Sequence, residues 1–139
     1  MAESERYRTG MATRRKVLGD AHVDRATKAI TELDADFQTF IVEGAWGSVW
    51  SKPDLTPRER SMVTIVLLAA LGHDEELAMH VRATRNTGAS IDDIRGALMH
   101  VAIYAGVPAA NSAFKLVKKT IEEMDRTAWA RPVPEERQR

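Results

Sequence analysis

Signals that start and stop helices constrain this chain more than any other feature. Thr56, Pro57 and Glu59 give a capping threonine, a proline at the first helical position and a glutamate three residues after the cap. Ser90 opens a later segment with a similar capping pattern. No stretch alternates apolar and polar residues over a convincing length, so the pattern predicts an all-α fold of about six helices. Glycines are expected to end three of them: Gly72, Gly88 and Gly106.

The helical segments expected from spacing and capping cover most of the chain. Before Pro53 two or three helices are expected, over about Glu5–Leu18, His22–Leu33 and Asp36–Trp50. After it come a segment from the Thr56 cap to Leu71, Asp74–Thr87, Ser90–Ala105, and a last helix from Pro108. The stretch ERSMVTIVLLAALG is apolar nearly all round and predicts a buried central helix. We expect a single domain over residues 1–130 and a polar, proline-broken tail over residues 131–139.

Composition excludes several classes of protein. The chain of 139 residues is 44% hydrophobic and 29% charged, as in globular domains, and it contains no cysteine for disulfides, thiol catalysis or thiolate metal sites. Twenty basic residues balance 20 acidic ones, which gives no general attraction for nucleic acid or anionic membranes. The N-terminus lacks an apolar signal segment, and the run Met62–Leu71 is too short to span a membrane. We therefore expect a cytoplasmic protein.

The first 16 residues are locally basic. Two interpretations fit this segment: a solvated face of a helix, or an arm that meets an anion. Its cations outnumber Glu3 and Glu5 and are Arg6, Arg8, Arg14, Arg15 and Lys16.

Glu76 and His80 lie four residues apart on one expected helix, at the margin of its apolar stripe. One interpretation is an ordinary contact between side chains one turn apart. The other is a carboxylate that orients and charges an imidazole for acid–base chemistry near neutral pH. His73 adds a third candidate ligand, but the spacing matches neither HExxH nor ExxH, so no metal site is expected.

Two further helical segments carry aromatic side chains. His100 and Tyr104 share a line beside the core stripe and would suit a pocket wall, although each alone is more typical of packing. Trp46 and Trp50 lie four residues apart and suggest a core or an interface. Small residues beside the tryptophans would let another backbone approach closely, as at an oligomer contact: Gly44 and Gly47.

Four separated motifs, taken together and in this order, closely resemble the carboxymuconolactone decarboxylase family. They are VLGDAHVDRA, EGAWGSVWSKPDLTPRERSM, LAALGHDEELAMHVRATRNTGAS and HVAIYAGVPAANSAF, and the resemblance covers roughly Tyr7 to Met124. The wider superfamily includes thiol-dependent peroxidases that carry a CxxC motif. Because this chain has no cysteine, the resemblance does not extend to peroxidase activity.

The resemblance implies an all-helical homo-oligomer, typically a ring-like hexamer, that acts in the protocatechuate branch of the β-ketoadipate pathway. Its substrate would be 4-carboxymuconolactone, a lactone with two carboxylates, and its products 3-oxoadipate enol-lactone and CO2. No organic cofactor or metal is expected, nor is nucleic acid or a membrane as a partner. The alternatives are a decarboxylase of a related lactone or keto acid, and a non-catalytic helical homologue that binds a small molecule.

On this basis Glu76 and His80 become the expected catalytic pair, without a decision on which of them handles the proton. Arg60, in the TPRERSM motif, is expected to bind a substrate carboxylate, because a guanidinium can donate two parallel hydrogen bonds to it. His22 is a second candidate for substrate binding, with helix capping after Asp20 as the alternative. Two aromatic residues are expected to line the pocket: Trp46 and Tyr104.

Overall fold

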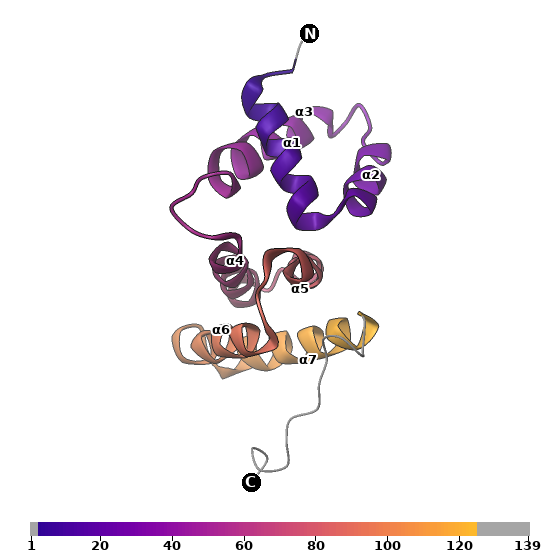
Figure 1. Ribbon diagram of the computed structural model, residues 1–139. Coiled ribbons are helices and arrows are strands. Elements are labelled where there is room, and N and C mark those ends of the chain that lie inside the picture. The colour runs from indigo at the N-terminus through magenta and orange to yellow at the C-terminus, as the bar shows by residue number, and fades with distance from the viewer. Residues whose placement is uncertain (1–2, 125–139) are drawn as a thin grey trace. The chain divides into compact units, whose positions relative to one another are not determined.

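The computed structural model describes residues 3–124 as a succession of helices (Figure 1). No strand occurs among these residues, which confirms the predicted all-α class. The tail predicted from Arg131 lies outside the described residues. Seven α-helices and one π-helix follow one another: α1 Glu5–Leu18, α2 Asp20–Lys28, α3 Ala35–Ile41, η1 Val42–Trp50, α4 Pro57–Leu71, α5 Asp74–Thr87, α6 Ile91–Tyr104 and α7 Val107–Glu123.

Local hydrogen bonds explain why the helices of the second half begin and end where the sequence predicts. The Thr56 N–H donates to the Glu59 carboxylate at 2.8 Å, and the Glu59 N–H donates to the Thr56 hydroxyl at 3.1 Å. Ser90 and Asp93 form the same reciprocal pair before α6. The glycines that end helices all have a positive φ, which disfavours a side chain: Gly72, Gly88 and Gly106.

The second helix is shorter than predicted. The sequence indicates about His22–Leu33, whereas α2 covers Asp20–Lys28. The chain then turns, because the Asp34 carboxylate accepts hydrogen bonds from the backbone N–H and the hydroxyl of Thr31, at 2.7 and 3.2 Å. Such local bonds from an aspartate compete with the continuation of a helix.

The segment predicted as one helix over Asp36–Trp50 changes type in its middle. It is α-helical to Ile41 and a π-helix from Val42 to Trp50. Two serine hydroxyls donate hydrogen bonds to the backbone carbonyl five residues earlier. Ser48 donates to the Glu43 carbonyl at 2.9 Å, and Ser51 donates to the Trp46 carbonyl at 2.6 Å. A wider turn of this kind is uncommon and is enriched at functional sites.

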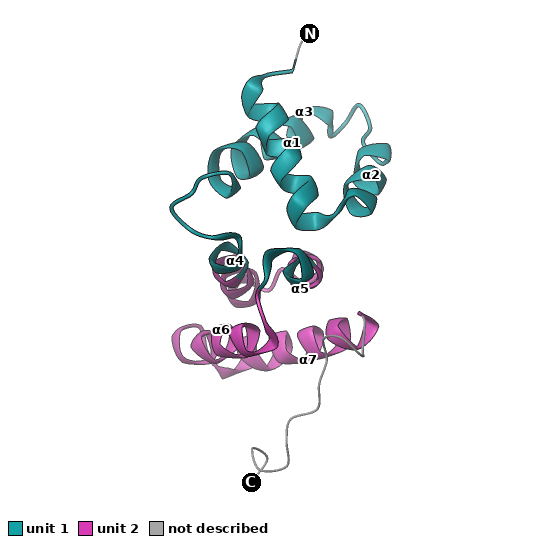
Figure 2. Cartoon of the chain, viewed as in Figure 1, with its two compact units in different colours: residues 1–61, 83–88 teal, residues 62–82, 89–139 magenta. Residues whose placement is uncertain are grey.

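The chain forms two compact units, coloured teal and magenta in Figure 2. Unit 1 comprises residues 1–61 and 83–88, and unit 2 comprises residues 62–82 and 89–139. Because α4 and α5 are each continuous, both helices contribute residues to both units.

In unit 1, α1 packs along η1 through two glycines. A Cβ at Gly10 would lie 2.2 Å from the Val42 carbonyl oxygen, and a Cβ at Gly47 would lie 2.4 Å from the Arg6 carbonyl oxygen. The close approach predicted for Gly47 therefore exists, but its partner is α1 of the same chain rather than another subunit. Gly44 has no neighbour within 4 Å. Beyond the crossing, Val17, Trp46 and Ala83 form a small buried cluster.

In unit 2, α6 packs against α7, and a larger apolar core draws on α4 to α7. Its most buried large side chains are Ile65, Leu77, Val81, Leu98 and Val101. The prediction that α4 is buried all round is wrong for this chain by itself. Three apolar side chains at successive turns of α4 are about half exposed or more: Val63, Leu67 and Leu71.

Substitution of alanine for the two glycines of η1 tests the close helix crossing. Gly47→Ala should lower the free energy of unfolding by about 1–3 kcal/mol, because the new methyl group meets backbone atoms that cannot move aside. Gly44→Ala, in the same π-helix but in open space, should be neutral or stabilising by up to about 1 kcal/mol. Urea unfolding of both variants measures the difference, and equal effects would contradict the crossing.

Candidate functional site

The expected catalytic pair lies on α5, in the part of that helix that belongs to unit 2. His80 is 7% exposed and has two core residues as its helical neighbours, Leu77 and Val81. Glu76, one turn earlier, is exposed to solvent. It belongs to an acidic first turn that also complements the positive end of the helix dipole. The helix therefore holds a buried imidazole one turn from an exposed carboxylate.

Arg60 lies in the first turns of α4 and is buried, with 8% of the residue exposed. Its Nη2 donates to the Lys52 carbonyl at 3.0 Å and to the Asp54 carboxylate at 3.3 Å. The guanidinium thus holds the loop between η1 and α4. Its Nε is buried and has no hydrogen-bond acceptor among the described residues. The Nη2 of Arg60 therefore has a structural role, whereas its Nε is a donor without an acceptor in the described part of the chain.

His22 and Trp46 both belong to unit 1. His22 is partly buried on α2, two residues after the helix begins at Asp20, so its ring is not in the N-cap position. That cap position is taken by Gly19, with no side-chain cap bond. Trp46 is 4% exposed in η1, and its ring lies 5.0 Å from that of Trp50 at a tilt of 33°. Trp46 is thus a core residue of unit 1.

The His100 and Tyr104 rings stack on α6, with centroids 5.2 Å apart and an interplanar angle of 23°. Tyr104 is 82% exposed, so its ring covers the surface rather than lining an enclosed space. His100 instead borders a shallow apolar hollow of about 460 Å³ between α4 and α6. The other residues around that hollow are Met62, Val63, Val66, Leu67, Gly96 and Ala97.

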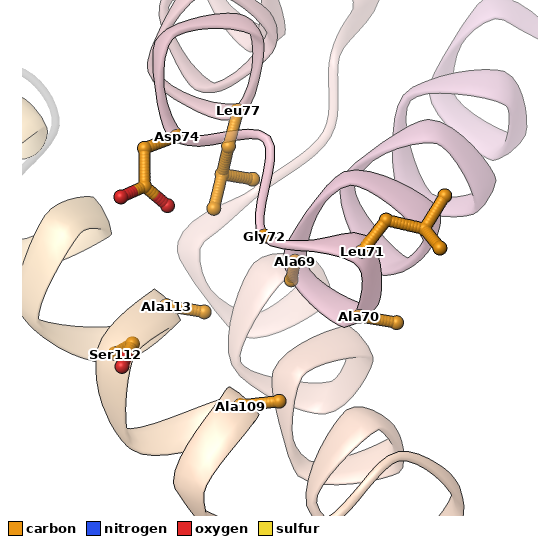
Figure 3. Close-up of a pocket in the computed structure, with 9 residues that line it drawn as sticks. All are labelled: Ala69, Ala70, Leu71, Gly72, Asp74, Leu77, Ala109, Ser112 and Ala113. Carbon is orange, nitrogen blue, oxygen red and sulfur yellow. The ribbon is translucent and has the colours of Figure 1, made fainter.

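A second hollow, of about 280 Å³, lies where the turn at Gly72 faces α7 (Figure 3). Alanines, a glycine and two leucines line it, together with two polar residues: Asp74, which follows the turn, and Ser112 on α7. None of the six predicted site residues lines it. Within residues 3–124, no group of three or more histidine, aspartate or glutamate side chains is placed to hold a metal ion, and no helix is long and apolar enough to cross a membrane.

Arg14 is a charged residue that the sequence interpretation did not single out. The other cations of the basic N-terminal segment are exposed or partly exposed, but Arg14 is 8% exposed on the inner face of α1. A signal for this existed in the spacing, because Arg14 falls four residues after Gly10 and three before Val17, and all three are buried.

The model of the Carboxymuconolactone decarboxylase family matches residues 35–119 of this sequence. The chain belongs to the carboxymuconolactone decarboxylase family. A 4-carboxymuconolactone decarboxylase of Acinetobacter baylyi is 40% identical over 124 residues, which are 89% of this chain and 92% of that relative. A nitrosuccinic acid decarboxylase of Metarhizium robertsii is 36% identical over 124 residues, covering 88% and 87% of the two chains. A 47-residue match to a 4-carboxymuconolactone decarboxylase of Pseudomonas putida is 47% identical and covers 34% of this chain and 98% of that sequence.

Membership of the carboxymuconolactone decarboxylase family makes this chain a carboxy-lyase, since these relatives are decarboxylases by name. The family match includes the whole of η1, α4, α5 and α6. The predicted site residues divide between the two units. Unit 2 carries Glu76, His80 and Tyr104, and unit 1 carries His22, Trp46 and Arg60.

Replacement of Arg60 tests its structural role. Arg60→Met removes both hydrogen bonds to the loop, so we expect faster amide exchange at residues 51–55 and a loss of about 1–3 kcal/mol in the free energy of unfolding. Asp54→Ala is the matched control. Asp54 is 73% exposed, and an exposed ion pair contributes about 0–1 kcal/mol. Unchanged exchange in Arg60→Met would show that other contacts hold the loop.

Proposed function

We propose that this enzyme decarboxylates 4-carboxymuconolactone to 3-oxoadipate enol-lactone and CO2, as a cytoplasmic step of protocatechuate catabolism in the β-ketoadipate pathway. The observation that carries the proposal is the 40% identity with a 4-carboxymuconolactone decarboxylase across 89% of this chain and 92% of that relative. The proposed partner is thus a small dicarboxylate lactone.

The chemistry of this substrate explains why an enzyme could act on it without an organic cofactor. The leaving carboxylate is attached to the γ carbon of an unsaturated lactone. When the C–C bond breaks, its two electrons move through the ring to the lactone carbonyl and give a dienolate, while the carboxylate departs as CO2. The lactone is therefore its own electron sink. The protein must stabilise the developing oxyanion and then deliver one proton to the α carbon.

In this proposal His80 donates the proton or hydrogen-bonds to the oxyanion, and Glu76 orients its ring. The support is the burial of the imidazole, since a hydrogen bond or a proton transfer is more effective away from water. The exposed position of Glu76 would let it exchange protons with solvent and so restore the acid after each turnover.

The remaining predicted residues have proposed roles in substrate binding. Arg60 would bind a carboxylate, and its buried Nε is the donor that the loop leaves unsatisfied. His22, partly buried on α2, and Trp46, buried in η1, would contact the substrate. Tyr104 is so exposed that a role at the site would require it to be covered by the substrate or by another subunit.

Substitution of His80 tests the catalytic assignment. His80→Ala and His80→Gln should each lower kcat for 4-carboxymuconolactone by about 10²- to 10⁴-fold, the usual contribution of a positioned proton donor. Glu75→Gln, an exposed acid one residue before Glu76, is the matched control and should retain wild-type turnover. Loss of the substrate's ultraviolet absorbance gives the rate, and circular dichroism checks the fold. Near-normal turnover in both His80 variants would overturn the assignment.

A second candidate function comes from the relative named for nitrosuccinic acid, at 36% identity over 88% of this chain. A nitro group can accept the electron pair released by decarboxylation, as the lactone carbonyl does, and a proton must again be delivered to carbon. Parallel assays of 4-carboxymuconolactone and nitrosuccinate at equal concentration would decide between them. A higher kcat/KM for nitrosuccinate would reject the first proposal. If neither compound is turned over, the substrate would be a related lactone or a keto acid, or the protein would have a non-catalytic role.

We also propose that the enzyme is a homo-oligomer, a hexamer as the family resemblance implies. The support is an apolar face on unit 2 made by exposed side chains of α4 and α6, here called the α4–α6 face. Large exposed apolar patches are typical of protein contact sites. The adjacent hollow of about 460 Å³ beside Gly96 would accept a side chain from a second copy. The residues of this face are Val63, Leu67, Leu71, Met99 and Ile103.

A charge placed on the α4–α6 face tests its part in assembly. Leu67→Glu should reduce the mass measured by sedimentation equilibrium, because a carboxylate would be desolvated in an apolar contact. Leu33→Glu is the control, since Leu33 is 95% exposed and lies in unit 1, outside this face. It should leave the mass of the assembly unchanged. An unchanged mass in Leu67→Glu would exclude this face as the contact.

A further inference from the structure

Arg14 lies at the centre of the buried face of α1. The close crossing with η1 at Gly10 is one turn before it, and Val17, a member of the cluster around Trp46, is one turn after it. Side chains at these spacings share a face of the helix, so Arg14 faces inward with its two buried neighbours. Only 8% of the residue is exposed.

Nothing among residues 3–124 neutralises this guanidinium. Its Nε is buried without a hydrogen-bond acceptor, and no acidic side chain of the described chain forms an ion pair with it. The ionisable groups that act on it are Tyr7 and Arg15, and Arg15 repels it. Burial lowers the pKa of Arg14 below its usual range, but a guanidinium still carries its charge near neutral pH.

Arg15, the next residue on the same helix, forms the ion pairs that Arg14 lacks within residues 3–124. Arg15 is about a third exposed and donates to two carboxylates, Asp20 at 3.0 Å and Asp24 at 2.9 Å. Arg60, the other buried arginine, has its Nη2 on the Lys52 carbonyl and on Asp54. Of these three arginines, Arg14 alone is both buried and unpaired. A buried charge without a counter-ion destabilises a fold, so an anion bound at Arg14 would offset that destabilisation.

We propose that the guanidinium of Arg14 binds a carboxylate of the substrate. Guanidinium and carboxylate match as paired donors and acceptors, and a water-poor setting strengthens the bond. The identification of this anion as part of a dicarboxylate lactone rests on the proposed function. Of the two carboxylates, Arg14 binds the one that the product retains, with Arg60 as a second donor to the same group. A cation held on the leaving carboxylate would stabilise the ground state and oppose the loss of its charge as CO2.

Steady-state kinetics on the full-length enzyme test the assignment. Arg14→Met should raise KM for 4-carboxymuconolactone about 10- to 100-fold with a smaller change in kcat, because the bond is present before and after the carbon–carbon bond breaks. Arg14→Lys should recover part of this loss, since it restores the charge without the fork. Arg15→Met is the matched control and should keep the wild-type KM. An unchanged KM in Arg14→Met would overturn the proposal.

Binding and stability measurements separate this proposal from the proposed function. Adipate, a stable dicarboxylate, should raise the Tm of the wild type and of Arg15→Met, with sodium chloride at equal ionic strength as the reference, and should not raise that of Arg14→Met. Without ligand, Arg14→Met should be as stable as the wild type or more stable, because it removes an uncompensated charge. These results would stand even if the enzyme did not turn over 4-carboxymuconolactone.

Two outcomes would assign Arg14 another role. A lower Tm of ligand-free Arg14→Met with adipate binding intact would make the guanidinium a packing residue. A change of sedimented mass in Arg14→Met, again with adipate binding intact, would mean that an acid of a second subunit neutralises it. Either result overturns the proposal. If Arg14→Met does not fold, the KM and the adipate response of Arg14→Lys decide the question in its place.

Discussion

The close contact of α1 with η1 at Gly10 and Gly47 is the constraint on which unit 1 depends. Each glycine leaves less room than a methyl group needs, so the two helices can approach only where both side chains are absent. This approach turns the face of α1 that bears Arg14 and Val17 inward. It also explains how an arginine comes to be buried on a helix that is otherwise strongly polar.

Both units bury polar groups at positions where an apolar residue would pack without the free-energy cost of desolvating a polar group. In unit 2, His80 lies beside Leu77 and Val81, which are 1% and 0% exposed. In unit 1, Arg14 and Arg60 each bury an Nε without an acceptor among the described residues. Buried polar groups that are not fully hydrogen-bonded lower stability. Their presence favours a role for these side chains in binding or catalysis, as expected of a decarboxylase, which must bind an anionic substrate and remove one carboxylate as CO2.

Prediction from sequence succeeded where the signal was local and failed where it depended on distant neighbours. The capping boxes at Thr56 and Ser90 follow from residues three positions apart, and the helices that they open begin as predicted. The early end of α2 and the π-helix are accompanied by hydrogen bonds of Asp34, Ser48 and Ser51 that periodicity does not reveal. The positions of Glu76 and His80 on one helix were predictable, whereas the burial of one and the exposure of the other were not.

The sequence by itself determined the all-α class, most helix boundaries, the family and the absence of thiol chemistry. These properties depend on short-range backbone preferences, on composition and on motifs that are read in order. The tertiary structure alone decided which side chains lose contact with water. Burial depends on which elements pack together. In the folded chain Arg14 is buried, whereas its neighbour Arg15 is partly exposed and forms ion pairs. Arg60 is buried too, and it donates a hydrogen bond to the Lys52 carbonyl. The fold also left Val63, Leu67 and Leu71 exposed on a helix that appeared apolar on every side.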